Sequence, residues 1–240
     1  MRVKRLTQVG LLMLALAAQR SFAESVPASI DGQAGKYQFL DHASQRWRLC
    51  AVLPHAFDRF FWAVAYGLNR QATALGVDIG IAEAGGYDRL PEQKRLIRQC
   101  AADRADAVLI AAIHPHALDD ELALLARRGI KVIDLVNGLA GDTVAAHSHQ
   151  DFFESGMLAA NYVLKTSKGQ ALRVAWFPGP ADAQWAMSFD AAVRKTLNAG
   201  KGELKSLTLV DGGWGAPYAT AQSGLVRTSG CRKWSIFRCA

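Results

Sequence analysis

The sequence predicts an α/β fold with two lobes, in which parallel sheets are covered by helices on both faces. Short apolar stretches alternate regularly with amphipathic stretches of helix length, which is the pattern of strand–helix–strand units. The apolar stretches are hydrophobic at successive positions, as strands buried on both faces are. The alternation resumes after a break at 142–151, which we interpret as a hinge crossing between the lobes.

The N-terminal lobe, 47–141, is expected to hold four strands separated by three helices. Gly76 suits the end of the first helix, because glycine readily adopts the left-handed conformation found there, and Pro91 suits the first turn of the second helix. Each crossover between parallel strands is expected to be right-handed. The expected strands are 47–54, 77–84, 106–113 and 131–137, and the expected helices are 58–76, 91–105 and 117–129.

The C-terminal lobe, 152–226, follows the same pattern but is expected to be incomplete. Its predicted elements are helices at 151–167 and 183–200 and strands at 171–179 and 205–212. Residues 227–240 are basic, contain two cysteines and show neither helical nor strand periodicity. We interpret this atypical tail as the product of a frameshift or truncation, with a genuine variant terminus as the alternative. Residues 24–46 are expected to form an extended lead-in.

Residues 1–23 are predicted to be a signal peptide. The basic stretch MRVKR precedes an apolar run from Val9 to Ala18, and the small residues of SFA allow cleavage after Ala23. The apolar run is too short to span a bilayer comfortably. We therefore expect an exported, periplasmic chain without membrane insertion, and an uncleaved membrane anchor is the alternative.

The formal net charge of +7 comes from the two ends of the chain. Four basic residues lie in 1–23 and four in 227–240, with no acidic residue in either segment, so the rest carries 20 basic and 21 acidic side chains. A neutral body lacks the basic surface that nucleic acids require. No nucleic-acid partner is therefore expected.

Two of the cysteines lie in the predicted N-terminal lobe. Cys50 falls in the first strand and Cys100 near the end of the second helix. In an oxidising compartment such a pair favours a disulfide that joins the strand to the helix. Two separate buried thiols, each acting as a small hydrophobic side chain, are the alternative.

Candidate binding residues follow the strands, because ligands of open α/β sheets bind beyond the carboxyl ends of the strands. The residues in these places are rich in aromatic rings and poor in catalytic groups, and we expect neither an enzyme nor a cofactor. The candidates are Asp58, Arg59, Phe60, Phe61 and Trp62 after the first strand, Gly86 and Tyr87 after the second, Asn137 after the fourth, and Phe152 and Asp182 at and beyond the crossing.

Several catalytic and metal-binding motifs are missing from the sequence. The glycine-rich stretches AGG and DGGWG match neither dinucleotide-binding nor phosphate-loop spacing, and there is no Gly-x-Ser-x-Gly elbow. The pairs His114–His116 and His147–His149 are expected to lie on irregular loops, where alternate histidines are not a recognised zinc spacing. No metal site is therefore expected, although a shared site for the two pairs is the alternative.

Several stretches between Trp47 and Asn198 resemble the type I periplasmic binding proteins, whose two lobes close on a ligand. The resemblance is carried by LCAVLP, DRFFWAVAYG, EAGGYDRL, LIRQC, LVN and FPGPADA, in this order. Within the family it is most specific for the branch that detects trimethylamine N-oxide and pairs with a sensor histidine kinase. It implies a small-molecule ligand of this kind and a kinase partner.

The resemblance also implies a cage of aromatic side chains around the ligand. Phe60 or Phe61, Tyr87 and Phe152 match the positions of the cage, with Asp58 beside them. Rings suit the methyl groups on a positively polarised nitrogen, and the oxide oxygen needs a hydrogen-bond donor. The two glycines before Tyr87 would let the backbone turn closely beneath the ligand.

Phe61 and Phe152 stand where the family has tryptophan, so the indole donor is missing at both positions. Tyr87, Arg59 or Trp62 is expected to supply a donor, or the ligand is a related methylated amine. The alternative function is a sugar receptor of an ABC transporter, for which Asp58, Arg59 and Asn137 offer polar contacts.

Overall fold

The computed structural model describes residues 25–211. The predicted signal peptide 1–23 and the atypical tail 227–240 lie outside these residues. Within the described part, no helix combines the length and the apolar character needed to cross a bilayer.

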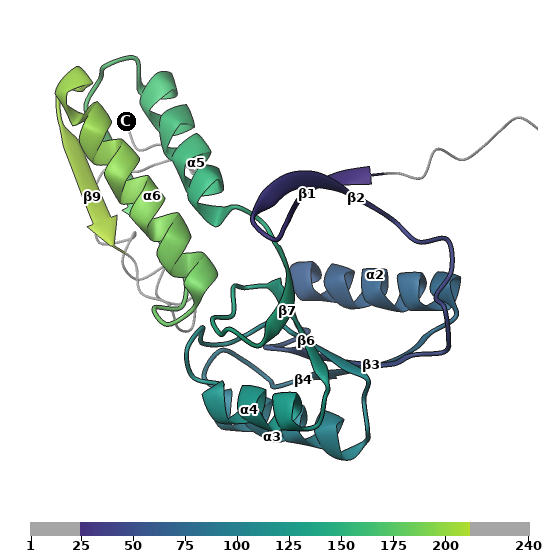
Figure 1. Cartoon of the computed structure of the whole chain (residues 1–240). Coiled ribbons are helices and arrows are strands. Elements are labelled where there is room, and N and C mark those ends of the chain that lie inside the picture. The colour runs from purple at the N-terminus through teal and green to yellow at the C-terminus, as the bar shows by residue number, and fades with distance from the viewer. Residues whose placement is uncertain (1–24, 212–240) are drawn as a thin grey trace, which may run out of the picture.

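The larger lobe is built on a five-stranded parallel sheet with the order β4-β3-β5-β6-β7 (Figure 1). Four of these strands are the predicted ones. The fifth, β7, lies within the stretch that the sequence suggested as a hinge crossing. The bounds are β3 Arg48–Leu53, β4 Asp78–Glu83, β5 Ala107–Ile110, β6 Lys131–Val136 and β7 Val144–His149.

Three helices cover the two faces of this sheet. Helix α2 lies on one face, and α3 and α4 lie side by side on the other (Figure 1). Helix α2 begins after Asp58, whose carboxylate accepts a hydrogen bond from the Phe61 amide at 2.9 Å, and ends at Gly76 in the left-handed conformation. The bounds are α2 Arg59–Leu75, α3 Leu90–Ala102 and α4 Asp119–Arg127, close to the predicted ranges.

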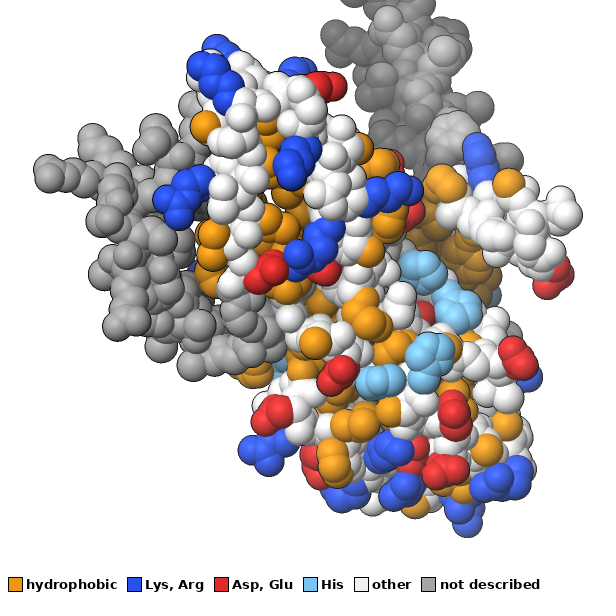
Figure 2. Space-filling view, turned by 90° about the vertical axis from the view of Figure 1, so that its left-hand side faces the viewer, with side chains coloured by type: hydrophobic (Ala, Val, Ile, Leu, Met, Phe, Trp, Pro, Cys, Tyr) orange, Lys and Arg blue, Asp and Glu red, His pale blue; other side chains and the backbone are white. Residues whose placement is uncertain are grey.

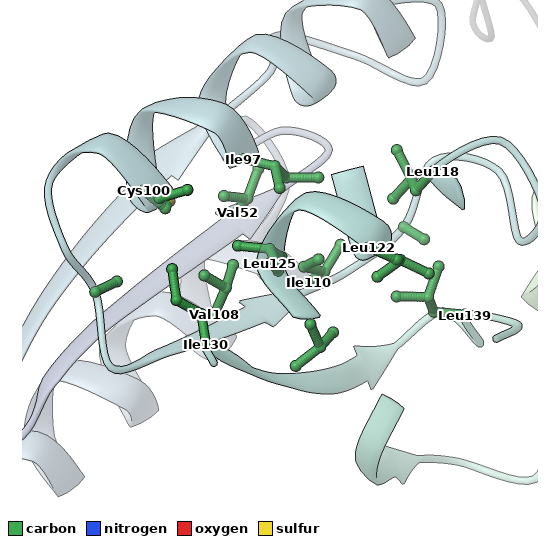
Figure 3. Packing of buried hydrophobic residues seen from close by; sticks show 14 residues of the cluster. Val52, Ile97, Cys100, Val108, Ile110, Leu118, Leu122, Leu125, Ile130 and Leu139 are labelled. Atoms are coloured by element: carbon green, nitrogen blue, oxygen red, sulfur yellow. The ribbon is translucent and has the colours of Figure 1, made fainter. Parts of the chain in front are cut away.

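The main core lies between the sheet and the α3–α4 layer. Figure 3 shows strand residues such as Val52, Val108 and Ile110 packed against Ile97 of α3 and Leu125 of α4, and all five side chains are fully buried. Complete burial of aliphatic side chains from both layers makes the larger lobe a self-contained hydrophobic unit.

A disulfide joins Cys50 of β3 to Cys100 of α3 across this core. The two residues are separated by 50 positions in the sequence, and their Cα atoms lie 5.9 Å apart. Of the two states that the sequence left open, the structure therefore has the bridge rather than separate thiols.

Within the described residues, the smaller lobe consists of two helices that run parallel to each other on a two-stranded parallel sheet, β8-β9 (Figure 1). The helices approach closely at Gly156, where an added Cβ would lie 2.6 Å from the carbonyl oxygen of Phe189. The bounds are α5 Phe152–Ser167, β8 Leu172–Trp176, α6 Gln184–Gly200, a short 3-10 helix at Lys201–Glu203, and β9 Leu207–Asp211.

Part of the expected lead-in forms an exposed antiparallel hairpin of β1 (Ser25–Ile30) and β2 (Gln33–Gln38). Its two-residue turn is Asp31-Gly32, and both residues have positive φ, 49° and 77°. This is the backbone that a tight hairpin turn requires, because its twist matches that of the flanking strands.

Candidate functional site

The carboxyl ends of β3, β4 and β6 meet the start of the smaller lobe, and the side chain of Tyr87 lies at this junction. The chain reaches Tyr87 through Gly85 and Gly86, whose φ angles are 95° and 153°. The Gly86 amide donates to the carbonyl of Pro54 at 2.8 Å, which ties the turn to the loop after β3. Side chains rarely adopt the φ angles of Gly85 and Gly86, so the close turn depends on glycine.

The Tyr87 hydroxyl oxygen accepts hydrogen bonds from both lobes. Asn137 Nδ2 donates to it at 3.0 Å from the larger lobe, and Trp185 Nε1 donates at 2.8 Å from the smaller lobe. Two accepted bonds use both acceptor positions of the hydroxyl and leave its own proton free to be donated. Burial raises the pKa of Tyr87 to about 12, against the effect of these two donors, so the phenol stays protonated at neutral pH.

Asn137 is held in place by a strained turn at the end of β6. Val136 has a φ of 67°, which is rare for a β-branched residue, and the Asn137 amide donates to the Leu135 carbonyl at 2.7 Å. Together these features describe the rarer, strained form of the γ-turn. Such strain costs about 1–3 kcal/mol and concentrates at functional sites.

The loop after β5 supports the same amide. Asn137 Nδ2 also donates to the Ala112 carbonyl at 2.8 Å. The buried Gln93 of α3 fixes this loop, because its side chain donates to the Ala111 carbonyl and accepts from the Ile113 amide, both at 2.9 Å. Three consecutive backbone positions are thereby held under the junction.

A pocket of about 280 Å³ opens beside this junction and is lined by both lobes. Phe152 lies in its wall with its ring 5.9 Å from that of Trp185. Gly138, at a φ of 84°, lets the lobes approach, because an added Cβ there would lie 2.9 Å from Gln184 Cγ. The lining residues are Val136, Asn137, Gly138, His149, Gln150, Asp151, Phe152, Phe153, Gln184, Trp185 and Ser188.

The structure brings together three of the candidates from the sequence. Tyr87 and Asn137 share a hydrogen bond. Phe152 contacts the ring of Trp185, which in turn donates a hydrogen bond to Tyr87. Gly86 supports the turn that carries Tyr87.

The remaining candidates lie elsewhere. Asp58 caps helix α2, and Phe61 is only 3% exposed in the core beneath Tyr87. Trp62 is 63% exposed and stacks on Tyr66, one turn further along α2. Arg59, Phe60 and Asp182 are exposed and do not line the pocket. The aromatic run after β3 therefore contributes less to the pocket than its sequence suggests.

Trp185, like Asp182, follows a predicted strand of the smaller lobe, where ligand-binding residues are expected, but the expected cage did not include it. It stands at the start of α6, close to the predicted helix boundary. In the structure its indole nitrogen donates to the Tyr87 hydroxyl. Of the three expected donors, Arg59 and Trp62 do not line the pocket, and Tyr87 contacts its lining residues Asn137 and Trp185.

His55, after β3, forms a second aromatic group behind the junction. Its ring stacks on Phe57 at 3.9 Å and meets the edges of Phe61 and Tyr87 at 4.9 and 5.5 Å between ring centroids. Burial lowers the pKa of His55, opposed by the charges of Asp58 and Glu83. Its Nδ1 is buried and has no hydrogen-bond partner among the described residues.

The junction therefore offers aromatic faces together with N–H and O–H donors. The ring centroid of Trp185 lies 5.9 Å from that of Phe152 and 6.4 Å from that of Tyr87. This arrangement suits a small ligand with an apolar, positively polarised part and one hydrogen-bond acceptor. A second pocket lies at the opposite, amino-terminal ends of the strands, where Arg48, Arg104 and Arg128 contribute to its lining.

Comparison with curated proteins finds similarity to the periplasmic protein TorT of Escherichia coli (strain K12). The two are 30% identical over 141 residues, which is 59% of this chain and 40% of TorT. The matched region thus spans less than half of that relative.

Solved structures of solute-binding proteins share the fold. An ABC transporter solute-binding protein from Bradyrhizobium sp. BTAi1 with bound bis-tris is 30% identical, with a TM-score of 0.66 over 88% of this chain and 66% of that one. The Caulobacter myo-inositol binding protein, bound to myo-inositol, is 22% identical, with a TM-score of 0.67 over 80% of this chain and 64% of that one.

A family profile described as "Periplasmic binding protein domain" matches residues 50–225. This range includes most of both lobes and every side chain that lines the pocket between them. The α/β architecture agrees with the solved relatives. The chain therefore belongs to the periplasmic binding protein family.

Proposed function

We propose that the chain binds trimethylamine N-oxide, or a closely related methylated amine, between its two lobes. The observation that carries the proposal is the Tyr87 hydroxyl. Its oxygen accepts hydrogen bonds from Asn137 and Trp185, and its own proton remains to be donated. Tyr87 is not itself among the residues that line the pocket, so a ligand oxide would accept this proton at the edge of the pocket, beside the lining residues Asn137 and Trp185. The similarity to TorT and the resemblance in the sequence support the same ligand class.

The methyl groups of such a ligand would lie against the rings of Phe152 and Trp185. Contacts between a positively polarised group and an aromatic face contribute about 0.5–2 kcal/mol each, and more where water is excluded. The pocket volume of about 280 Å³ is at the small end of the range of about 300–1,000 Å³ for ligand sites, which suits a compact molecule.

Signalling to a membrane sensor histidine kinase is part of the proposal. A ligand that contacts both lobes stabilises their closed arrangement only by its higher affinity for that arrangement. The periplasmic domain of the kinase would then distinguish the two arrangements. Export to the periplasm, as the N-terminal sequence predicts, is required for this role.

Calorimetric titration of the full chain with trimethylamine N-oxide tests the proposal. The native chain is expected to give saturable heat, and Tyr87→Phe is expected to weaken binding about 10-fold or more, because it removes the donor together with the oxygen that Asn137 and Trp185 contact. Trp62→Phe is the matched control, since Trp62 is exposed on α2 and stacks on Tyr66. Equal affinity in all three proteins would refute the role of Tyr87.

A sugar-binding function is the second candidate, favoured by the polar groups of the pocket. Asn137, Gln150, Asp151 and Gln184 line it together with the aromatic residues, and sugar binding depends on such hydrogen-bonding side chains. The same titration with myo-inositol separates the candidates. Saturable binding of myo-inositol without binding of trimethylamine N-oxide would replace the first proposal by the second.

A further inference from the structure

Strands β6 and β7 bring two histidines and a buried aspartate together on one face of the sheet. His147 Nδ1 lies 3.0 Å from Asp134 Oδ2, and His149 Nδ1 lies 4.0 Å from the same oxygen. One potential ligand atom from each residue lies within 4.8 Å of the other two. We propose that these three side chains bind a divalent transition-metal ion of the zinc type.

The backbone arrangement explains why the three side chains meet. The sequence suggested that His147 and His149 lie on an irregular loop, but the structure places both on β7, where residues two apart point to the same face. Asp134 is paired with His147 across the β6–β7 ladder, so its side chain points to that face as well. Alternate histidines on a strand, unlike those on a loop, have a fixed common direction.

The buried aspartate supplies the second, independent reason to expect a cation. Asp134 is 0% exposed, and its Oδ1 atom has no hydrogen-bond partner among the described residues. A buried carboxylate oxygen without a donor is costly. Both histidine distances are to Oδ2, so an ion at the site would compensate for Oδ1 by contacting both carboxylate oxygens. His147 alone satisfies only the other oxygen.

The ligand set and its spacing suit zinc more than calcium or magnesium. Zinc binds imidazole nitrogen and carboxylate oxygen at about 2.0–2.2 Å, so tetrahedral ligand atoms lie about 3.3 Å apart. This value lies between the 3.0 and 4.0 Å that separate the two histidine nitrogens from Asp134 Oδ2. The two imidazoles are 45% and 52% exposed, which leaves their rings free to close on an ion by small rotations. Two histidines and one carboxylate leave a fourth position for water or another donor.

The proposed site adjoins the pocket between the lobes, since His149 belongs to both. Figure 2 shows histidine side chains gathered on one face at the level where the smaller lobe meets the larger one. An ion here would be reachable from solvent. The inference does not depend on the nature of the small molecule bound in the pocket.

Titration of the full chain with zinc, prepared without a polyhistidine tag and measured by calorimetry, tests the site. We expect one equivalent to bind, and replacement of zinc by Co²⁺ to give the visible absorption of a four-coordinate ion. His149→Gln is expected to weaken zinc binding at least about 10-fold, and Asp134→Asn to do the same while preserving the shape of the buried side chain. Calcium is expected to give no heat.

The pair His114 and His116 provides the matched control. These two histidines are also two residues apart, with ring centroids 6.3 Å apart, but they are not part of a described group with a carboxylate. A variant with both His114→Gln and His116→Gln is expected to bind zinc as the native chain does. The proposal is overturned if the native chain fails to bind zinc, or if it binds zinc with an affinity that His149→Gln leaves unchanged. In the first case Asp134 and His147 form a hydrogen bond only.

Discussion

The two lobes contain the same kinds of element but differ in how completely they bury them. In the larger lobe, β3 and β5 each end in three buried residues, and the core of fourteen buried residues extends across the sheet to α3 and α4. In the smaller lobe, β9 has no buried residue, and the buried clusters contain three residues each. A regular strand–helix pattern therefore predicts where helices and strands form. How deeply their side chains are buried depends on how many layers of helix and sheet pack against each element.

The disulfide adds to this difference, because it lies wholly in the larger lobe. Replacing both residues, Cys50→Ala and Cys100→Ala, is expected to lower the free energy of unfolding by about 4 kcal/mol, since the bridge closes a loop of 50 residues. Hydrogen exchange measured by mass spectrometry should show the loss of protection in β3 and α3, with α5 and α6 less affected. Equal loss in both lobes would contradict the view of the larger lobe as a separate core.

Two glycines in helices sharpen the comparison, because the same substitution has opposite effects in the two lobes. Gly156→Ala in α5 is expected to destabilise by about 1–3 kcal/mol, since its Cβ would lie 2.6 Å from a backbone oxygen of α6. Gly67→Ala in α2 is the control, where no atom lies within 4 Å of the added carbon, and it is expected to stabilise by up to about 1 kcal/mol. Urea denaturation of both variants measures the sign, and two values of the same sign would contradict the close packing of α5 on α6.

The last prediction concerns Tyr87, where the lobes meet, and its effect appears only at high pH. Its pKa of about 12 in the folded chain lies above the ordinary value of 10, so the folded state holds this proton more tightly than the unfolded state. The resulting stability is fully present below pH 10 and is lost as the pH rises towards 12. Absorbance titration of the tyrosines should show one late phase in the folded chain, which Tyr87→Phe removes. Persistence of this phase in Tyr87→Phe would show that Tyr87 is not its source.

Much of the fold could be predicted from local pattern. The end of α2 was predicted from Gly76, because a left-handed residue is a local requirement of a helix end. Asp58, expected as a binding residue, instead caps the start of the same helix. The hairpin at Asp31-Gly32 was equally local but was interpreted only as extended chain. Its Asp-Gly pair is a strong turn signal. The flanking segments contain few apolar residues, so they lack the apolar alternation that predicts strands.

The sequence alone determined the order and type of most elements, since hydrophobic periodicity and helix ends depend on residues close together in the chain. Only the tertiary structure decided which side chains meet. Tyr87 and Trp185 are 98 residues apart, and nothing local to either residue specifies the hydrogen bond between them. Asp134 and His147 meet because β7 pairs with β6 in one register, and a shift of one residue would turn both histidines to the other face. Sites of this kind depend on strand register and lobe contact, which are properties of the whole fold.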